Sequence, residues 1–394
     1  MSDASFIPFH RPSIGQEELD AISRVLNSKW LTTGPVAQQF ERDFAAYVGG
    51  KHALAVNSAT AALQLSLDAI GLRPGDEVLV PTYTFTATAE VITYFGARPV
   101  LCDSLPGAFN IDPVDAERRV TEKTRAIIPV HMAGEPCDLA AIHRIAERYG
   151  LHVIEDAAHA LPAAYQGRRI GAVSELTAFS FYATKTITTG EGGMLLTDND
   201  EFAERISIMR LHGISGDAWK RYAKDGSWYY EVVQPGYKSN LCDLLAALGA
   251  AQLAKCDGFA ERRRAIAAFY REAFAGIEEL ENPPAGEDGN EHSWHLFMLR
   301  LRPESLAVNR SQFIEELKKR GIGTSVHFIP LHLHPFYAAE YGYRQGDFPH
   351  AEDAFSRCLS LPIFPDLSHE EMERVAVAVT EIVDQTRKGV LVAA

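Results

Sequence analysis

The amino-acid sequence predicts an α/β fold built on a largely parallel β-sheet with helices on both faces. Between residues 53 and 200, short apolar runs alternate with longer amphipathic stretches, as in strands joined by helices. The apolar runs are nearly continuous, which is typical of strands that are buried on both faces. Proline, glycine and aspartate at 74–76 separate two of these elements as turn residues do.

The expected elements follow one another in chain order. Strands are expected at 53–56, 77–81, 97–103, 125–131, 151–156, 177–182 and 193–197. Helices are expected at 60–70, 86–95, 139–149, 200–211, 241–275 and 311–320, and a later strand at 295–301. Ligands of such sheets bind outside the carboxyl ends of the strands, so the polar residues after each strand are candidates for a functional site.

The chain changes its organisation near a loop at 281–293, which is rich in proline, glycine and charge. Beyond it, Ser368 and Glu371 form a capping box that predicts a terminal helix. A chain of 394 residues can form two units with their own cores. We therefore expect a large domain over residues 1–260 and a smaller C-terminal α/β domain over residues 261–394.

Composition and charge narrow the classes of partner. Hydrophobic residues make up 46% of the chain and charged residues 23%, as in ordinary globular proteins. The net charge of −14 disfavours general binding to nucleic acid or to an anionic membrane. No apolar run approaches the ~20 residues of a membrane span, and no signal peptide is recognised. The five cysteines are scattered without a CxxC pair, so we expect reduced thiols and a cytoplasmic protein.

Two ionisable residues follow expected strands. Lys185 lies just past the strand at 177–182, where burial would lower the pKa of its amine and make it nucleophilic toward an aldehyde. Asp156 ends the strand at 151–156, where a carboxylate can hold a proton on a pyridine-type nitrogen. Its neighbour Glu155 should point to the other face of the sheet. A solvated loop lysine and an acid that caps a helix are the alternatives, and the two residues alone leave them open.

An anion could bind where a helix is expected to begin, at 57–60. First-turn N–H groups have no partner within their helix, and the helix dipole favours negative charge. Ser180 could add a hydroxyl to the same anion, and Phe85 could cover the face of a ring. His159 could contact the same ligand. Each of these features also has a common structural explanation, such as a helix cap or a packed core residue.

Three histidines, His327, His332 and His334, lie in an irregular segment at 327–335. Histidines raise the question of a metal site, but this segment holds no Asp, Glu or Cys to complete one. We therefore expect no metal and consider substrate contact or structural roles. The glycines near 191–193 match neither of the common nucleotide-binding patterns.

Taken together, motifs along the chain resemble the DegT/DnrJ/EryC1/StrS family of sugar aminotransferases that depend on pyridoxal 5'-phosphate (PLP). The motifs are SATAAL (58–63), PTYTFTATAE (81–90), EDAAHA (155–160), FSFYATKTITTGEGG (179–193), LHGISGDAW (211–219), GYKSNLCDLLAALGAAQL (236–253), PLHLHPFY (330–337) and LSLPIFPDL (359–367). The resemblance extends from WLTTGP at 30–35 to the last of these motifs, and it implies PLP-dependent transferase fold type I.

The resemblance also implies roles for single residues. Lys185 would bind the PLP aldehyde covalently and carry protons, and Asp156 would pair with the ring nitrogen. His159 would lie near the ring hydroxyl, and Phe85 would stack on the ring. The phosphate would be held by three residues of the same chain and one from a second subunit, which implies a homodimer with shared active sites: Ala59, Thr60 and Ser180, with Asn240 from the neighbour.

The implied reaction moves an amino group from an amino acid, L-glutamate, to a nucleotide-linked keto sugar. Many relatives read GYNxR where this chain reads GYKSN at 236–240, which resembles a branch that aminates C4 of UDP-4-keto sugars. We therefore expect C4 of a UDP- or dTDP-4-keto sugar as the acceptor. The candidate substrate contacts are Trp30, Thr32, Lys238, His327 and His332.

Other functions remain open at this point. A cyclitol ketone or a C3-keto sugar could be the acceptor. A sugar dehydratase is disfavoured, because the relatives that dehydrate have histidine where this chain has Lys185. A catalytically silent regulator on the same fold is disfavoured by the joint presence of Lys185, Asp156 and Ser180.

Overall fold

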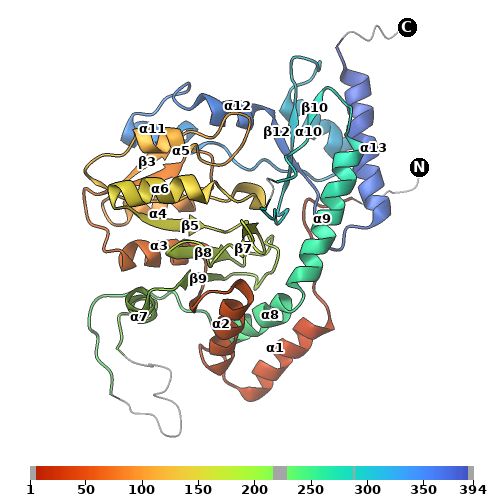
Figure 1. The fold of residues 1–394 in the computed structure, drawn as a ribbon. Coiled ribbons are helices and arrows are strands. Elements are labelled where there is room, and N and C mark those ends of the chain that lie inside the picture. The colour runs from red at the N-terminus through yellow and green to blue at the C-terminus, as the bar shows by residue number, and fades with distance from the viewer. Residues whose placement is uncertain (1–5, 216–228, 287–288, 389–394) are drawn as a thin grey trace.

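The structure, a computed structural model, describes residues 6–215, 229–286 and 289–388. Its central layer is a seven-stranded sheet in the order β1-β9-β8-β5-β4-β2-β3 (Figure 1). The strands are β1 (His52–Val56), β2 (Glu77–Pro81), β3 (Arg98–Cys102), β4 (Thr124–Ile127), β5 (His152–Asp156), β8 (Leu176–Ser180) and β9 (Gly193–Thr197). All neighbouring pairs are parallel except those of β9, which is antiparallel to β1 and β8. The predicted α/β class and mostly parallel sheet are confirmed.

Helices cover both faces of this sheet, as the continuous apolar strands require. One core contains Val78 and Val80 of β2, and the other contains Leu79 between them, because side chains alternate along a strand. The first core takes its helical residues mainly from α3 (Ala59–Ala69), α4 (Ala87–Thr93) and α7 (Asp200–Met209). The second takes them mainly from α2 (Pro35–Val48), α6 (Leu139–Tyr149) and α8 (Asp243–Leu253).

A second, smaller sheet carries the C-terminal part. It pairs β10 (Leu280–Glu281), β11 (Phe297–Leu301) and β12 (Cys358–Leu361) in antiparallel order. Its core is formed with α9 (Cys256–Ala273), α10 (Arg310–Lys319) and α13 (His369–Thr386). Ile7 bridges to Ile322, so the start of the described chain also joins this part. The predicted domain boundary after residue 260 falls inside α9, and the division stays a prediction.

The remaining elements are short or peripheral. They are α1 (Gln16–Ser28), α5 (Pro113–Arg118), η1 (Met132–Gly134), β6 (Ala164–Tyr165), β7 (Arg168–Arg169), η3 (Leu331–Leu333), α11 (Pro335–Tyr341) and α12 (Pro349–Arg357). The helix expected at 241–275 is divided into α8 and α9, and the strand expected at 125–131 ends at Ile127. Residues 216–219 of the motif at 211–219 lie outside the described residues.

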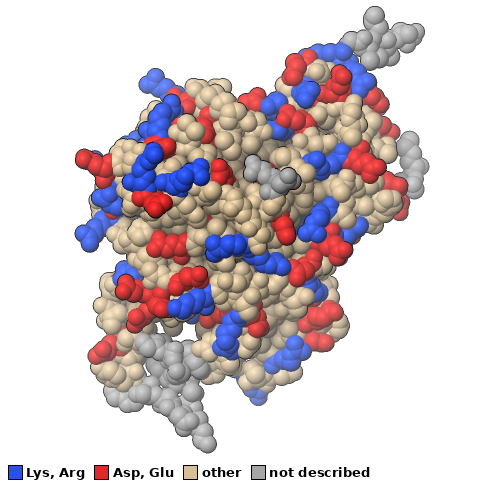
Figure 2. Space-filling model, in the orientation of Figure 1, with Lys and Arg blue, Asp and Glu red and all other residues tan. Residues whose placement is uncertain are grey.

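The visible surface mixes charges of both signs. Figure 2 shows lysine and arginine interspersed with aspartate and glutamate over this face, without one broad basic area. Among the residues that the structure describes, no helix has the length and apolar character needed to cross a bilayer.

Candidate active site

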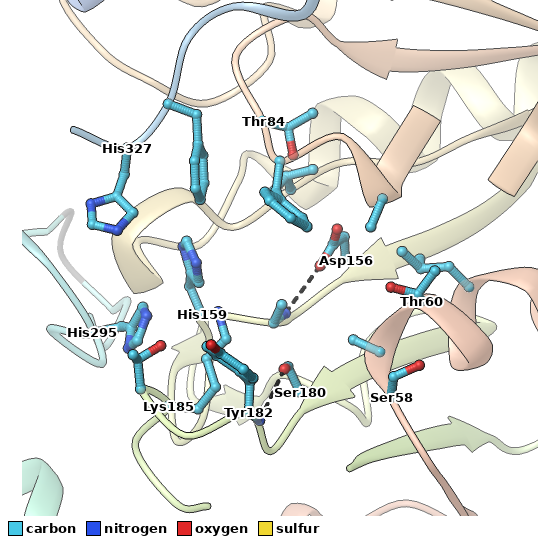
Figure 3. A pocket seen from close by; sticks show the side chains of 18 of the residues that line it. Ser58, Thr60, Thr84, Asp156, His159, Ser180, Tyr182, Lys185, His295 and His327 are labelled. Atoms are coloured by element: carbon cyan, nitrogen blue, oxygen red, sulfur yellow. Dashed lines mark hydrogen bonds between the residues drawn. The ribbon is translucent and has the colours of Figure 1, made fainter. Parts of the chain in front are cut away.

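A cavity of about 590 Å³ lies at the carboxyl ends of the parallel strands, where the sequence predicts a ligand site. Its walls come from the ends of β1, β2, β5 and β8, and from the C-terminal part of the chain. Figure 3 shows His295 and His327 on one side, Ser58 and Thr60 on the opposite side, and Asp156 between them. Eight of the predicted site residues line this cavity: Ala59, Thr60, Phe85, Asp156, His159, Ser180, Lys185 and His327.

Asp156 ends β5 as a buried carboxylate that is held by neutral hydrogen-bond donors. Its Oδ2 accepts a hydrogen bond from the Thr88 hydroxyl at 2.8 Å, and its Oδ1 accepts one from the Ala158 N–H at 3.1 Å. Burial raises the pKa of Asp156, while these hydrogen bonds and the charge of Lys185 oppose that rise. The carboxylate is therefore fixed in position and still has lone pairs that can accept a further proton donor.

Lys185 lies in the turn after β8 and is half-buried at the cavity wall. Its backbone N–H donates to the carbonyl of Tyr182 at 2.9 Å, which holds the turn. Burial lowers the pKa of Lys185 to about 8, although the carboxylate of Asp156 works in the opposite direction. At that pKa about a tenth of the amine is neutral and nucleophilic at pH 7, a much larger fraction than for an unperturbed lysine.

The N-terminus of α3 forms one end of the cavity. Ser58 caps the helix by accepting a hydrogen bond from the Ala61 N–H at 3.1 Å, and the N–H groups of Ala59 and Thr60 belong to the first turn. A side chain at Gly193 would put its Cβ only 2.6 Å from the backbone carbon of Ser58, so only glycine lets β9 approach this turn so closely. The geometry suits an anion such as phosphate.

Aromatic rings form the middle and the far wall of the cavity. Phe85 exposes 57% of its surface, and its ring lies 5.6 Å from that of Phe328. His159 accepts a hydrogen bond at Nδ1 from the Ala133 N–H at 3.3 Å, so its proton lies on Nε2. Burial, with the charge of Lys185, holds the pKa of His159 well below its usual range. His159 therefore offers a neutral N–H donor.

Five predicted residues lie outside this cavity: Trp30, Thr32, Lys238, Asn240 and His332. Asn240 donates to the Thr33 hydroxyl at 2.6 Å and bridges to Val56 at the open side of β1. Together with Thr33 it lines a separate polar hollow of about 550 Å³. Lys238 donates to the Asn240 side chain at 2.5 Å. These residues form a second cluster that does not reach the cavity of the same chain.

Trp30 and Thr32 belong to the same neighbourhood as Asn240. The Trp30 indole donates to the Thr33 carbonyl at 3.3 Å, and the Thr32 carbonyl accepts from the N–H of Asp243 at 3.2 Å. His332, in contrast, is buried under the C-terminal part of the chain. It bonds to the Thr82 hydroxyl at 2.8 Å and to Glu352 at 2.9 Å, an arrangement that ties η3 to the end of β2.

Several cavity residues are absent from the sequence prediction. Thr88, behind the cavity wall, contacts Asp156 from α4 and was not singled out because it lies seven residues after the end of β2. Phe9, His295 and Ser325 reach the cavity from segments that are distant in the chain and carry no local pattern. Within the described part of the chain, no three His, Cys, Asp or Glu side chains are grouped so that they could hold a metal ion.

The cavity matches the chemical groups of the expected cofactor. PLP has an aldehyde, a pyridine nitrogen and a phosphate, and the cavity offers an amine at Lys185, a buried carboxylate at Asp156 and the N-terminus of α3. The flat ring of Phe85 lies in the same space. The residues present therefore fit PLP.

Comparisons with known proteins agree with this geometry. A sequence model of the DegT/DnrJ/EryC1/StrS aminotransferase family matches residues 12–380. The spore coat polysaccharide biosynthesis protein SpsC of Bacillus subtilis is 50% identical over 379 residues, which cover 96% of this chain and 97% of SpsC.

Solved structures show the same relationship. Spr1654 of Streptococcus pneumoniae, described as a sugar aminotransferase and solved in its PMP form, superposes with a TM-score of 0.91 at 34% identity, covering 96% of this chain and 99% of that chain. PseC of Helicobacter pylori, an aminotransferase of pseudoaminic acid biosynthesis, has a TM-score of 0.90 at 28% identity, covering 97% and 100% of the two chains. The chain therefore belongs to the DegT/DnrJ/EryC1/StrS family of PLP-dependent sugar aminotransferases.

Proposed function

We propose that this enzyme transfers the amino group of L-glutamate to C4 of a nucleotide-linked 4-keto sugar, with UDP or dTDP as the nucleotide. The observation that carries the proposal is the single cavity in which Lys185, Asp156 and the N-terminus of α3 face one another. A transaminase needs an amine that carries protons, an anion that keeps a ring nitrogen protonated, and a phosphate anchor. These three groups come together from separate strand ends.

Each of these residues has a definite task in the proposed reaction. PLP, when bound, supplies a ring that withdraws electrons from the carbon that loses a proton. Asp156 holds the proton on the ring nitrogen, and the first-turn N–H groups of α3 with the Ser180 hydroxyl hold the phosphate. Lys185 would hold the cofactor through its aldehyde, and its free Nζ would remove the Cα proton of the amino acid.

The second half-reaction uses the same residues in reverse. Lys185 Nζ delivers a proton to the sugar carbon that receives the amino group. The Nε2–H of His159, whose Nδ1 accepts from Ala133, would donate a hydrogen bond to the ring hydroxyl. Phe85 covers the ring face, and its exposed position leaves room for it to do so.

The sugar acceptor is supported by the relatives. SpsC is described as a protein of spore coat polysaccharide biosynthesis, and PseC as an aminotransferase in pseudoaminic acid biosynthesis. The branch motif at 236–240 favours C4 as the aminated carbon. Substrate contacts are assigned to His327, which lines the cavity, and to Trp30, Thr32 and Lys238 near the edge of β1.

We further propose that two copies of this chain build each active site. Asn240 and Lys238 lie at the open edge of β1, away from their own cavity, where a second copy could receive them. Leu31 and Val232 near this edge leave about half or more of their surface exposed, with values of 48% and 61%. All five cysteines are free thiols, which fits the cytoplasmic location that the sequence predicts.

The central test follows the cofactor and the acceptor separately. Purified protein with PLP should show the visible absorbance band of lysine-bound PLP, and borohydride should leave a mass adduct at Lys185. L-Glutamate should bleach the band, and a UDP- or dTDP-4-keto sugar should restore it. Lys185→Ala should abolish both effects, whereas Lys319→Ala, an exposed lysine in α10, should leave them unchanged.

Defined outcomes would overturn each part of the proposal. Absence of the band and of the adduct would reject the cofactor role of Lys185. Restoration by a 3-keto sugar or a cyclitol ketone, but not by 4-keto sugars, would reject the C4 assignment. Mixing Lys185→Ala with Asn240→Ala protein should restore part of the activity, because one site of a mixed dimer is intact; no recovery would reject shared sites.

A further inference from the structure

A chain of two threonine hydroxyls leads from the cavity wall to Asp156. The Thr84 and Thr88 hydroxyl oxygens lie 2.8 Å apart, and the Thr88 hydroxyl donates to Asp156 Oδ2 at 2.8 Å. Thr88 is fully buried and Thr84 is 2% exposed. Thr84 lines the cavity beside Phe85, whereas Thr88 lies deeper, against the carboxylate.

The direction of both hydrogen bonds follows from the number of protons. A hydroxyl has one proton to donate, and Thr88 gives its proton to Asp156. In the contact between the two threonines, Thr84 must therefore be the donor and Thr88 the acceptor. The chain thus runs from Thr84 through Thr88 to Asp156, and each bond polarises the next one.

This chain of hydrogen bonds ends at a carboxylate whose charged form requires stabilisation. Burial disfavours the charged form of Asp156, so every donor that contacts it favours that form. The Ala158 N–H is a backbone group that any residue would supply, whereas the Thr88 hydroxyl depends on the residue type. The titratable groups that influence Asp156 are Lys185 after β8 and His131 after β4.

We propose that Thr88, supported by Thr84, is a positioning residue that fixes the Asp156 carboxylate in the orientation and the ionic form that a protonated ring nitrogen requires. The inference rests on the assignment of Asp156 to the ring nitrogen made above. Neither threonine touches the reacting carbon. Their effect is therefore expected in the binding of PLP and in its pH dependence, before any catalytic step.

The neighbouring threonines supply a useful contrast. Four threonines occur between residues 82 and 88, and only Thr84 and Thr88 lead to Asp156. Thr82 bonds to His332, and Thr86 lies near Tyr337, so both tie this loop to the C-terminal part. Two of the four threonines therefore connect this loop to the C-terminal part of the chain, and the other two orient the Asp156 carboxylate.

The experiment measures PLP affinity of the cofactor-free protein by absorbance titration between pH 5 and pH 9. Thr88→Val keeps the shape but loses the donor, and should weaken PLP binding by about tenfold or more, as for loss of a hydrogen bond to a charged group. Thr88→Ser keeps the hydroxyl and should stay within about twofold of the wild type. Thr93→Val, in the same helix but away from Asp156, should have no effect.

The pH profile separates this role from simple packing. Without the Thr88 donor the pKa of Asp156 rises further, so the carboxylate is protonated at a higher pH. The loss of PLP affinity on acidification should therefore begin at a higher pH in Thr88→Val than in the wild type, and not in Thr88→Ser. A packing role predicts the reverse, with Thr88→Ser impaired and the profile of Thr88→Val unmoved; that result would overturn the proposal.

The part played by Thr84 is tested by a double-mutant cycle. Thr84→Val should weaken PLP binding by about threefold in the wild-type background and have no effect in the Thr88→Val background, because its contribution passes through Thr88. Equal losses in both backgrounds would reject the chain. If circular dichroism shows that Thr88→Val does not fold, Thr84→Val takes its place. The proposal is supported if Thr84→Val loses PLP affinity at a higher pH than the wild type and Thr84→Ser does not. It is rejected if the pH profile of Thr84→Val is that of the wild type.

Two controls keep this outcome apart from the proposed function. If wild-type protein fails to bind PLP, the proposed function fails before the threonines are tested. If Asp156→Asn binds PLP as the wild type does at every pH, the assignment of Asp156 fails. The threonine proposal alone is rejected by one pair of results. The wild type binds PLP through Asp156, and Thr88→Val has the PLP affinity and the pH profile of the wild type.

Discussion

Two neighbouring carboxylates, on opposite faces of β5, have different surroundings. Glu155 points to one side and pairs with His131 at 2.6 Å, with both side chains wholly inaccessible to solvent. Asp156 points to the cavity side and is held by a hydroxyl and a backbone N–H. The first carboxylate pairs with a buried imidazole, whereas the second lies at the cavity that Lys185 lines. The difference separates an acid that stabilises the fold from one that is prepared for a ligand.

The partners of Glu155 complete its hydrogen bonding. The N–H of Cys137 donates to His131 Nδ1 at 3.0 Å, so the His131 proton lies on Nε2 and points to Glu155. Glu155 Oε1 also accepts from the Ser174 N–H at 3.1 Å. Burial alone would raise the pKa of Glu155, but these hydrogen bonds hold it below its usual value. Asp156 shows the opposite direction, because burial outweighs the hydrogen bonds from the Thr88 hydroxyl and the Ala158 N–H.

The largest effect is expected on the stability of the folded protein when Glu155 is removed. Glu155→Ala should lower the free energy of unfolding by about 3–5 kcal/mol, because it leaves the buried donors of His131 and Ser174 without an acceptor and opens a cavity. Urea denaturation of the cofactor-free protein measures the change. The surviving folded fraction should still give the absorbance band with PLP. A loss of PLP affinity without loss of stability would contradict the structural role of Glu155.

The second effect is on the cofactor. Asp156→Asn is expected to weaken PLP binding by about a hundredfold, since the proposed charged partner of the ring nitrogen is lost. Because burial of a charge disfavours Asp156 in the cofactor-free protein, the stability of that form should not fall. Absorbance titration and thermal melting test the two halves of this prediction. An Asp156→Asn variant that binds PLP normally but melts early would reverse the interpretation.

A smaller effect concerns the amine of Lys185. With a pKa of about 8, its reaction with a small aldehyde should speed up about tenfold per pH unit below that value and level off above it. Asp156 raises this pKa, so Asp156→Asn should move the profile to lower pH, while Glu155→Gln should leave it in place. Borohydride trapping followed by peptide mass spectrometry at position 185 gives the rates. A profile that moves equally in both variants would contradict the selective influence of Asp156.

Much of this site could be predicted from local pattern. Asp156, Lys185 and the start of α3 each follow an apolar strand, and parallel strands bring their carboxyl ends to one edge. The opposite directions of Glu155 and Asp156 follow from the alternation of side chains along a strand. Their partners could not be predicted in this way. The contact between Thr88 and Asp156 joins residues 68 positions apart, and only the folded sheet brings them together.

Two expected elements end elsewhere in the structure, one for a local reason and one beside a distant contact. The expected strand at 125–131 ends early because Pro129 has no N–H to donate to a neighbouring strand. The expected helix at 241–275 is interrupted at Lys255, which forms an ion pair with Glu18 of α1. His295 and Phe9 reach the cavity only because the C-terminal part packs over the sheet edge.

The close approach at Gly193 has a consequence for redesign of the enzyme. Because Gly193 has no side chain, the backbone of β9 lies directly against the first turn of α3. Any other residue at position 193 would force these two segments apart. Phe9 and Ser325 line the same cavity from segments outside the seven-stranded sheet. A directed-evolution library can therefore vary Phe9 and Ser325 in search of new sugar acceptors while the glycine beside the proposed phosphate anchor is kept.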